Sequence, residues 1–259
     1  MPYTISLEGK KALVTGGARG IGAEICRQFA FAGADIAINY YHSDADRKAA
    51  KSLKAEIESL GRSALLCEAD VSNESEVNSM VEEVAIDFGS IDIVVNNAGI
   101  LESSPFDELG TDTWNHILGV ILQGAFYVTR AAVPYMLKKN SGSIIMITTN
   151  CTINGGGGSA AYPAAKAGVE GLARQLTIEY AGRGIRANII RPAVIDTELF
   201  RQRYDTDEAV REYGKKLPVG RVGKPEDIAN LAVFLASDKS SYICGAAIPV
   251  DGGRTYYKQ

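Results

Sequence analysis

Cysteine and histidine are scarce in this sequence of 259 residues, which contains four cysteines and two histidines. The cysteines lie far apart and form no C-x-x-C pair, so the sequence predicts neither a disulfide framework nor a zinc site. Neither histidine is placed to act as a metal ligand, and we expect no metal centre. The cysteines are Cys26, Cys67, Cys151 and Cys244, and all but Cys151 are expected to pack as small apolar residues.

An excess of basic charge is also missing. The chain has 27 Lys and Arg against 31 Asp and Glu, for a formal net charge of -4. Without a basic stripe or a polybasic patch, we expect neither a nucleic acid nor a membrane as partner. Residues 1–10 lack the basic-then-apolar pattern of a signal peptide, and no run is long enough to span a bilayer, so a cytoplasmic protein is expected.

No low-complexity stretch, internal repeat or flexible linker divides the chain, and its 46% hydrophobic content suffices for one large core. Residues 1–259 are therefore predicted to form a single domain. Short β-rich apolar runs alternate with longer stretches of helical spacing. The predicted strands are 12–15, 35–39, 63–67, 91–96, 143–148 and 185–190. This alternation predicts an α/β fold, a Rossmann-type doubly wound parallel sheet with helices on both faces.

A glycine-rich turn follows the first predicted strand and precedes a helical run over residues 23–31. Gly16, Gly20 and Gly22 allow the backbone to turn sharply and to approach a pyrophosphate, which the free N–H groups and the dipole of a helix N-terminus attract. The pattern predicts a nucleotide-binding site, and the alternative is a glycine turn without a ligand. A second glycine run, residues 155–158, is expected to line a cleft or to form a tight turn.

Four motifs give the chain a resemblance to the classical short-chain dehydrogenase/reductase family, and the resemblance runs nearly end to end. They are the G-x-x-x-G-x-G turn, Asp70-Val71, Asn96-Asn97-Ala98-Gly99 and the pair Tyr162 and Lys166. The resemblance implies hydride transfer between a nicotinamide dinucleotide and a carbonyl or alcohol carbon. The cofactor contacts proposed from the turn, from these motifs and from the residues discussed next are Gly16, Arg19, Gly20, Ile21, Gly22, Tyr41, His42, Ser43, Asp70, Val71, Asn97, Ala98, Gly99, Tyr162, Lys166, Pro192, Ile195 and Thr197.

The choice between the two nicotinamide cofactors depends on the end of the second predicted strand. An acidic residue there would bind a ribose hydroxyl and repel a 2'-phosphate. This sequence instead has Asn39 followed by two tyrosines, His42 and Ser43, with Arg19 in the glycine turn and Arg47 nearby. These residues offer donors and positive charge to a phosphate, so NADP(H) is favoured over NAD(H), although two aspartates nearby weaken the argument.

Tyr162 and Lys166 are four residues apart, so on a helix they share one face. A free tyrosine has a pKa near 10, and a neighbouring cation would lower it by stabilising the phenolate. Tyr162 is thus predicted to be the acid/base, and Lys166 is predicted to lower its pKa. The family places a serine thirteen residues before this tyrosine, and Thr149 stands there; the resemblance assigns it the orientation of the substrate, with Thr148 and Thr152 as alternatives.

One position departs clearly from the family. A catalytic asparagine usually lies seven residues after a tryptophan in the fourth helix, and counting from Trp114 leads to Ile121. In the family this asparagine helps to hold a water that connects the lysine to solvent. The isoleucine is expected to replace that contact with a dry surface, so proton exchange is expected to be slower or rerouted.

The remaining third of the chain supplies a substrate lid and scaffold. Residues 197–216 are predicted to form a mobile helical lid, whose aromatic residues either touch the substrate or anchor the lid. By resemblance, residues 242–253 form the last strand, and the chain assembles as a homotetramer. The overall pattern is closest to glucose dehydrogenases and β-ketoacyl carrier-protein reductases, which implies a small ketone, aldehyde, sugar or polyol substrate. The alternative is a dinucleotide-binding sensor or structural protein with little turnover.

Overall fold

The computed structural model of the protein describes residues 4–256, so the ends of the predicted domain and part of the segment examined for a signal peptide lie outside the described residues. Within them the strands form a seven-stranded sheet in the order β3-β2-β1-β4-β5-β6-β7, and neighbouring strands are parallel. The strands are β1 Lys11–Val14, β2 Asp35–Tyr40, β3 Ala64–Glu68, β4 Ile93–Asn96, β5 Gly142–Ile147, β6 Ile185–Pro192 and β7 Ala247–Val250.

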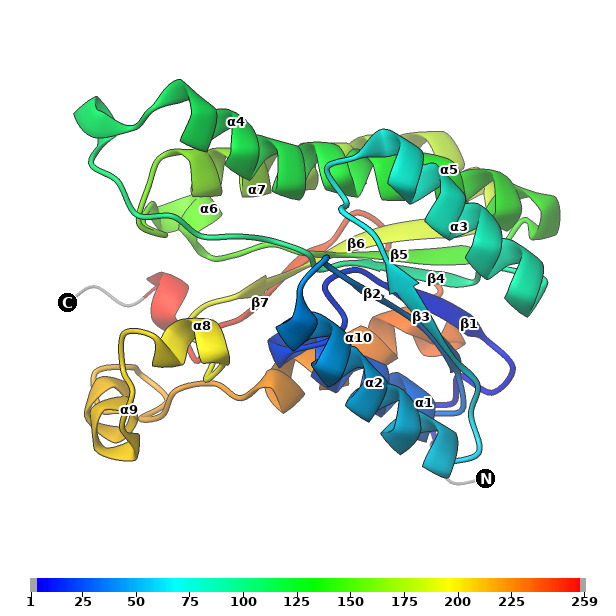
Figure 1. Cartoon of the computed structure of the whole chain (residues 1–259), viewed down its shortest axis with the longest axis horizontal. Helices are drawn as coiled ribbons and strands as arrows, with labels where there is room; N and C mark the ends of the chain where they lie inside the picture. Colours follow the sequence, from blue (N-terminus) through cyan, green and yellow to red (C-terminus); the bar gives the residue numbers. More distant parts are fainter. Residues whose placement is uncertain (1–3, 257–259) are drawn as a thin grey trace.

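Helices cover both faces of this sheet (Figure 1). On one face lie α1 Gly20–Phe31, α2 Asp44–Ser59 and α10 Pro225–Ala236. On the other lie α3 Glu74–Phe88, α4 Thr111–Leu118, α5 Gly124–Lys139 and α7 Ala161–Tyr180. Three short helices, α6 Cys151–Asn154, α8 Glu198–Arg201 and α9 Asp207–Gly214, gather at the same end of the molecule.

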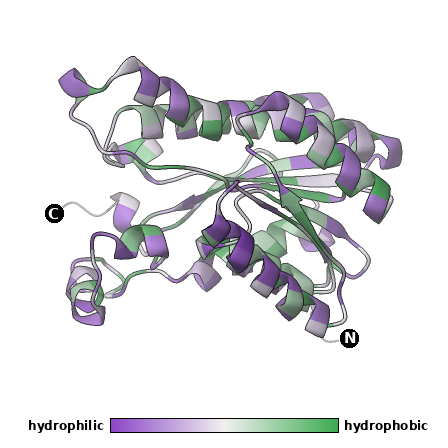
Figure 2. Ribbon diagram, in the orientation of Figure 1, coloured by the Kyte–Doolittle hydropathy of each residue, from purple (hydrophilic) through white to green (hydrophobic). Residues whose placement is uncertain are grey.

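Two hydrophobic cores result, one on each face. Val94 and Met146 belong to the core under α3, α5 and α7, whereas Val95 and Ile145 belong to the core under α1 and α10. Successive strand residues therefore point into opposite cores, which explains why the strands read as continuous apolar runs. The apolar colouring of the strands between more polar outer helix surfaces follows this arrangement (Figure 2).

The predicted fold class is confirmed. The six strands expected from apolar runs are all present, with bounds shifted by one or two residues, and the last strand forms inside the segment 242–253. The bounds shift because hydrogen bonding between neighbours decides where a strand ends, and a run of apolar residues does not contain that information.

A continuous helical stretch, residues 111–139, joins α4 to α5 through a π-helical turn, Gly119–Gln123. By length and composition alone it is apolar enough to cross a membrane, but half of its most apolar window is buried in the fold. Val128 and Met136 are fully buried in the core against the sheet. Packing inside the domain therefore accounts for its apolar composition.

Candidate active site

The site is centred where the strand order reverses, between the adjacent strands β1 and β4. In doubly wound sheets, ligands bind beyond the carboxyl ends of the strands at this point. The glycine turn between β1 and α1 lies there, and Gly16 and Gly20 have positive φ values of 57° and 54°. A Cβ atom on Gly22 would come within 2.2 Å of the Gly16 carbonyl oxygen. The turn thus requires glycine at these positions.

The N-terminus of α1 is suited to an anion. Its N-cap, Arg19, makes no side-chain hydrogen bond to the first turn, and that turn contains no acidic residue. By contrast, α2 and α3 begin with Ser43 and Asn73, whose side chains accept backbone N–H groups, and both have acidic residues in their first turns. The first N–H groups of α1 are therefore available to a phosphate, as the sequence predicted for Gly20, Ile21 and Gly22.

Asn97 ties the two central strands together. Its side-chain amide donates to the backbone oxygens of Thr15 at 2.9 Å and Gly16 at 3.0 Å. The hydroxyl of Thr15 accepts in return from the backbone N–H groups of Asn97 and Ala98. Gly99 follows, and a Cβ there would lie 3.5 Å from Nζ of Lys166. The predicted cofactor segment 97–99 thus connects the glycine turn to the predicted catalytic lysine.

Asn39 is a buried support that sequence reasoning did not identify. Its Oδ1 accepts from the backbone N–H of Gly16 at 3.2 Å, and its Nδ2 donates to the backbone oxygens of Cys67 and Ala69. The side chain therefore points under the glycine turn and does not face a ribose. The amide, with a donor and an acceptor, can join two chain segments that both present backbone groups.

The cations expected beside a 2'-phosphate are present at the end of β2, and each already has acidic partners. Arg19 bonds to Asp46 at 2.6 Å and to Glu198 at 2.8 Å. Ser43 donates its hydroxyl to Asp46 at 2.7 Å. The ring of Tyr41 is exposed and lies 5.5 Å from that of His42.

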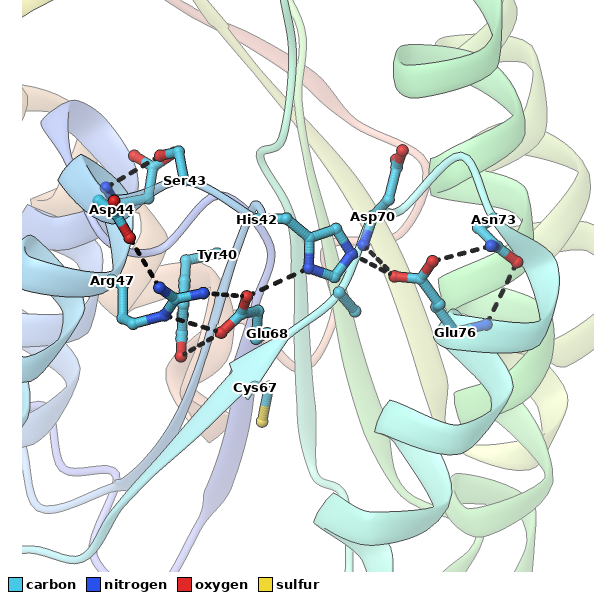
Figure 3. Close-up of polar contacts among 12 residues, drawn as sticks. Tyr40, His42, Ser43, Asp44, Arg47, Cys67, Glu68, Asp70, Asn73 and Glu76 are labelled. Carbon is cyan, nitrogen blue, oxygen red and sulfur yellow. Dashed lines mark hydrogen bonds and ion pairs between the residues drawn. The ribbon is translucent and has the colours of Figure 1, made fainter.

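Glu68 and Glu76, which the sequence analysis did not identify, hold the other donors of this region (Figure 3). Arg47 bonds to Glu68 through Nε and Nη2, and His42 lies between Glu68 and Glu76. Glu76 also accepts the backbone N–H of Asp70 at 2.8 Å. The segment after β3, which begins with the predicted cofactor contact Asp70, is thereby linked to the end of β2.

Asp70 and Val71 begin the connection from β3 to α3. The Asp70 carboxylate accepts from the backbone N–H and the hydroxyl of Ser72, at 2.8 and 2.7 Å. Val71 is buried against Gly124, where an added Cβ would come within 2.9 Å of its side chain. The segment is therefore fixed on both sides, which gives a bound ring a rigid edge.

Tyr162, Lys166 and Thr149 meet in one place. The Thr149 hydroxyl lies close enough to the Tyr162 phenol to lower its pKa. Nζ of Lys166 lies 5.9 Å from the centroid of the Tyr162 ring and donates to the backbone oxygen of Ile147 at 2.7 Å. The three predicted catalytic side chains thus come from the first turns of α7 and from the segment after β5.

Burial dominates the pKa values of Tyr162 and Lys166. It raises the pKa of Tyr162 to about 12, aided by the nearby Cys151 thiol and opposed by the Thr149 hydroxyl. Burial also lowers the pKa of Lys166 to about 8. The Lys166 ammonium bonds to a backbone oxygen, so the loss of water around the phenol outweighs its effect on the tyrosine.

The neighbouring threonines distinguish among the alternatives for Thr149. Thr148 and Thr152 donate their hydroxyls to the buried carboxylate of Glu170, at 3.3 and 2.9 Å. Glu170 is also held by a two-pronged ion pair with Arg191 of β6. Thr148 and Thr152 therefore tie α7 to β5 and α6, and of these three threonines Thr149 is the one whose hydroxyl acts on the pKa of the tyrosine.

Ile121 lies in the π-helical turn and is buried, with an exposed fraction of 2%. It borders a cavity of about 10 Å³ whose lining also includes Lys166 and Asn96. Among the described residues, Oδ1 of Asn96 is one of the few buried side-chain atoms without a hydrogen-bond partner. Ile121 thus places an apolar side chain beside the lysine, and the small space next to it has polar groups on two sides.

The second glycine run lies beside the site. Of its two predicted roles, lining a cleft or forming a tight turn, the structure favours the first. Residues 155–158 all have positive φ values, between 73° and 105°. A Cβ on Gly157 would come within 2.5 Å of the Tyr162 ring, and one on Gly158 within 2.4 Å of the Ser103 hydroxyl. Glycine is needed here for both conformation and space.

The segment after β6 returns to the glycine turn. Pro192 ends β6, Ile195 is buried, and Thr197 begins α8 by accepting the N–H of Phe200. A Cβ on Gly20 would lie 3.5 Å from the Thr197 methyl group. Thr197 and the predicted pyrophosphate site are therefore neighbours.

The predicted lid contains the two short helices α8 and α9, joined by aromatic packing. The rings of Phe200 and Tyr204 stack at 4.7 Å, and Tyr213 packs edge-on against both. Arg254 donates to the Tyr213 hydroxyl at 2.8 Å. In this structure the three rings contact one another, which favours the anchoring role among the two that the sequence left open.

A doubly wound sheet, a glycine turn at its switch point and a Tyr-Lys-Thr constellation define a nucleotide-dependent oxidoreductase fold. The chain belongs to the short-chain dehydrogenase/reductase family, because residues 16–255 match the family model described as enoyl-(acyl carrier protein) reductase. Its homologues support an enzyme that acts on CH-OH or C=O groups with a nicotinamide cofactor.

Several known proteins are similar over nearly the whole chain. A 3-oxoacyl-(acyl-carrier-protein) reductase of Chlamydia trachomatis is 38% identical over 95% of this chain and 98% of its own. The 3beta-hydroxysteroid dehydrogenase 1 of Eggerthella lenta is 38% identical over 97% and 95%. A gluconate 5-dehydrogenase of Burkholderia cenocepacia, solved with NADP and tartrate, has a TM-score of 0.89 at 34% identity and covers 98% of both chains.

Proposed function

We propose that this protein is an NADP(H)-preferring oxidoreductase that interconverts a small ketone or aldehyde with the corresponding alcohol, sugar or polyol. The observation that carries the proposal is the grouping of Thr149, Tyr162 and Lys166: the Thr149 hydroxyl acts on the Tyr162 phenol, and Nζ of Lys166 lies 5.9 Å from the centroid of the Tyr162 ring. Two hydroxyl groups converge at one point, where they can hold a single substrate oxygen.

Reduction of a carbonyl adds a hydride to carbon and a proton to oxygen. The nicotinamide supplies the hydride when it is bound. Tyr162 supplies the proton, since its pKa of about 12 keeps the phenol neutral at pH 7. Thr149 orients the same oxygen. Lys166, with a pKa of about 8, is mostly protonated at pH 7 and holds a proton within the site beside Tyr162. Alcohol oxidation uses the same groups in reverse.

The residues that would hold the dinucleotide follow the edge of the sheet. Gly16, Ile21 and the free first turn of α1 take the pyrophosphate, and Asp70 with Val71 takes the adenine. Residues 97–99 and 192–197 flank the nicotinamide. β2 itself ends without an acidic residue, and Arg19, His42 and Ser43 are donors near this end that could exchange their present carboxylate partners for a phosphate, which supports NADP(H) over NAD(H).

The lid over residues 197–216 closes the substrate side. Arg19 reaches across from the glycine turn to Glu198, so the lid is joined to the cofactor side by an exposed ion pair. Such a pair is worth little in stability, about 0–1 kcal/mol, and can open and close during turnover.

We also propose a single domain, a cytoplasmic location and a homotetramer. The homotetramer is supported by the exposed side chains of Phe126 on α5 and Ile178 on α7.

The proposal is tested with purified protein, by oxidation of NADPH and NADH across a panel of ketones, aldehydes and keto-sugars, with the reverse reaction on alcohols and sugars. A 3-oxoacyl thioester belongs in the panel, because relatives named as carrier-protein reductases are 38% identical. We expect turnover of at least one class and a lower KM for NADPH than for NADH. Absence of turnover throughout the panel contradicts the proposal.

A second function, a dinucleotide-binding sensor or structural protein with little turnover, is favoured by Ile121. This residue removes the amide that the family uses beside the lysine. Calorimetric titration separates the two functions: tight NADPH binding together with no turnover on any compound supports the binding protein. Measurable turnover that depends on Tyr162 supports the enzyme.

A further inference from the structure

Glu68, the last residue of β3, is contacted by the side chains of three other residues at the end of the sheet (Figure 3). Arg47 of α2 bonds to it with two nitrogens, at 3.1 and 2.7 Å. His42 reaches its Oε1 at 3.2 Å, and the hydroxyl of Tyr40, its partner across the sheet, reaches Oε2 at 3.3 Å. These contacts hold its pKa at about 2, Arg47 contributing most, so the carboxylate is ionised under ordinary conditions.

His42 is fixed from both sides. Its Nδ1 faces Glu68, and its Nε2 faces Glu76 at 2.6 Å. Ionised carboxylates only accept hydrogen bonds, so both ring nitrogens must donate, and a histidine that donates from both is an imidazolium. The contacts with Glu76 and Glu68 accordingly raise the pKa of His42.

Both cations border the position where a doubly wound fold distinguishes a ribose 2'-hydroxyl from a 2'-phosphate, the end of β2. The Arg47 donors are taken up in this structure by Glu68 and, through Nη1, by Asp44 at 2.8 Å. A phosphate at this position would have to compete with these carboxylates for Arg47 and His42. It would also be repelled by the negative charge of Glu68, which bonds to both cations.

We infer that Glu68 is a specificity-determining residue for the cofactor, because it withholds Arg47 and His42 from a 2'-phosphate and so limits the preference for NADP(H). The inference rests on the proposed function, since it requires a dinucleotide at this edge of the sheet. The uncharged ribose hydroxyls of NAD(H) need neither cation, so Glu68 acts on one cofactor and leaves the other unaffected.

The direct test is Glu68→Gln, which keeps the shape of the side chain and removes its charge. Titration with NADPH and with NADH, followed by protein fluorescence and by calorimetry, gives both Kd values. The change frees Arg47 and His42 and removes a repelling charge, so we expect the Kd for NADPH to fall by roughly tenfold. The Kd for NADH is expected to change by less than about threefold, because its ribose hydroxyls carry no charge.

Two further variants isolate the cause. Glu74→Gln removes a carboxylate that lies on α3 two residues before Glu76 and pairs with Arg130 instead, so it controls for loss of negative charge alone. Arg47→Gln is made in both backgrounds as a double-mutant cycle. With Glu68 present, Arg47→Gln should alter the Kd for NADPH little. In the Glu68→Gln background, Arg47→Gln should reverse most of the increase in NADPH affinity that Glu68→Gln produces.

Different results contradict the role of Glu68 and the proposed dinucleotide-dependent function. If wild-type protein binds neither NADPH nor NADH, the proposed function fails. If both bind and Glu68→Gln leaves their Kd ratio unchanged, or Glu74→Gln changes it equally, the inference is overturned. A tenfold loss of NADPH affinity in Arg47→Gln alone also overturns it, and this measurement remains decisive should Glu68→Gln not fold.

Discussion

The hydroxyl of Thr149 lies beside the phenol of Tyr162 and lowers its pKa, across thirteen residues of sequence that include a four-glycine run. Where the family usually has serine, the chain thus keeps the hydroxyl and adds a methyl group. The stiffer side chain of threonine limits rotation of this hydroxyl, which favours one direction for the hydrogen bond.

Replacement of this hydroxyl is expected to lower turnover. In Thr149→Val the shape is retained and the donor is lost, so the substrate oxygen loses one of its two partners. Removing one such donor in other enzymes costs about 10²–10³ in kcat. We expect a fall of roughly 10²-fold in kcat with little change in the Kd for cofactor. Thr149→Ser, the matched control, should retain activity; equal losses in both variants would contradict an orienting role for the hydroxyl.

Restoring the family's amide is expected to speed proton exchange. Ile121→Asn places a polar group beside Lys166 and the cavity that Asn96 also lines. The amide can join Lys166 and Asn96 through a water, because a site needs two to four polar partners to hold one. We expect a higher kcat and a smaller solvent isotope effect. Ile121→Val, which stays apolar, should change neither; an unchanged isotope effect in Ile121→Asn would count against a restricted relay.

Gly157 is expected to tolerate no side chain. Its φ of 79° is in the left-handed region, and an added Cβ would come within 2.5 Å of the Tyr162 ring. Gly157→Ala should therefore displace the ring and reduce kcat by more than tenfold while the protein stays folded. Gly155→Ala is the matched control, because it carries a similar φ but meets no atom within 4 Å. Similar loss in both would indicate backbone strain rather than contact with the tyrosine.

Burial of the charged Lys166 side chain is expected to lower the free energy of unfolding, although the same side chain is needed for turnover. Its pKa falls from 10.5 to about 8 on burial, so the unfolded chain binds more protons between these values. Stability consequently rises as pH increases from about 8 to 10.5, and below pH 8 the folded protein carries the full cost of the buried charge. Lys166→Met should raise the free energy of unfolding at pH 7 by about 1–3 kcal/mol and abolish turnover. A lower melting temperature at pH 7 would contradict this cost.

The parts of the site that the sequence predicted are those encoded by local spacing. Gly16, Gly20 and Gly22 lie within one turn, and Tyr162 and Lys166 share one helical face, so a pattern along the chain is enough to find them. Thr149 was found by its spacing from the tyrosine, through resemblance to the family.

The supporting groups escaped prediction because their partners are far apart in sequence. Asn39 reaches residue 69, His42 reaches Glu76, and Thr148 reaches Glu170, each across more than twenty residues. No periodicity connects such positions; only the pairing of β2 with β3 and the packing of α7 on the sheet bring them together. For the same reason the sequence listed Arg19, His42 and Arg47 as donors and noted the two nearby aspartates, but did not identify the more distant carboxylates Glu68, Glu76 and Glu198.

The central claim, that Tyr162 carries the proton in a hydride transfer, is tested most directly by Tyr162→Phe. This change removes one oxygen atom and keeps the ring that packs against Gly157. Cofactor Kd and turnover are measured on the same preparation with the best substrate of the panel. We predict that the Kd for NADPH stays within about threefold and that kcat falls by about 10²–10⁴-fold, the usual range for loss of a general acid. Undiminished turnover in this variant would contradict the account.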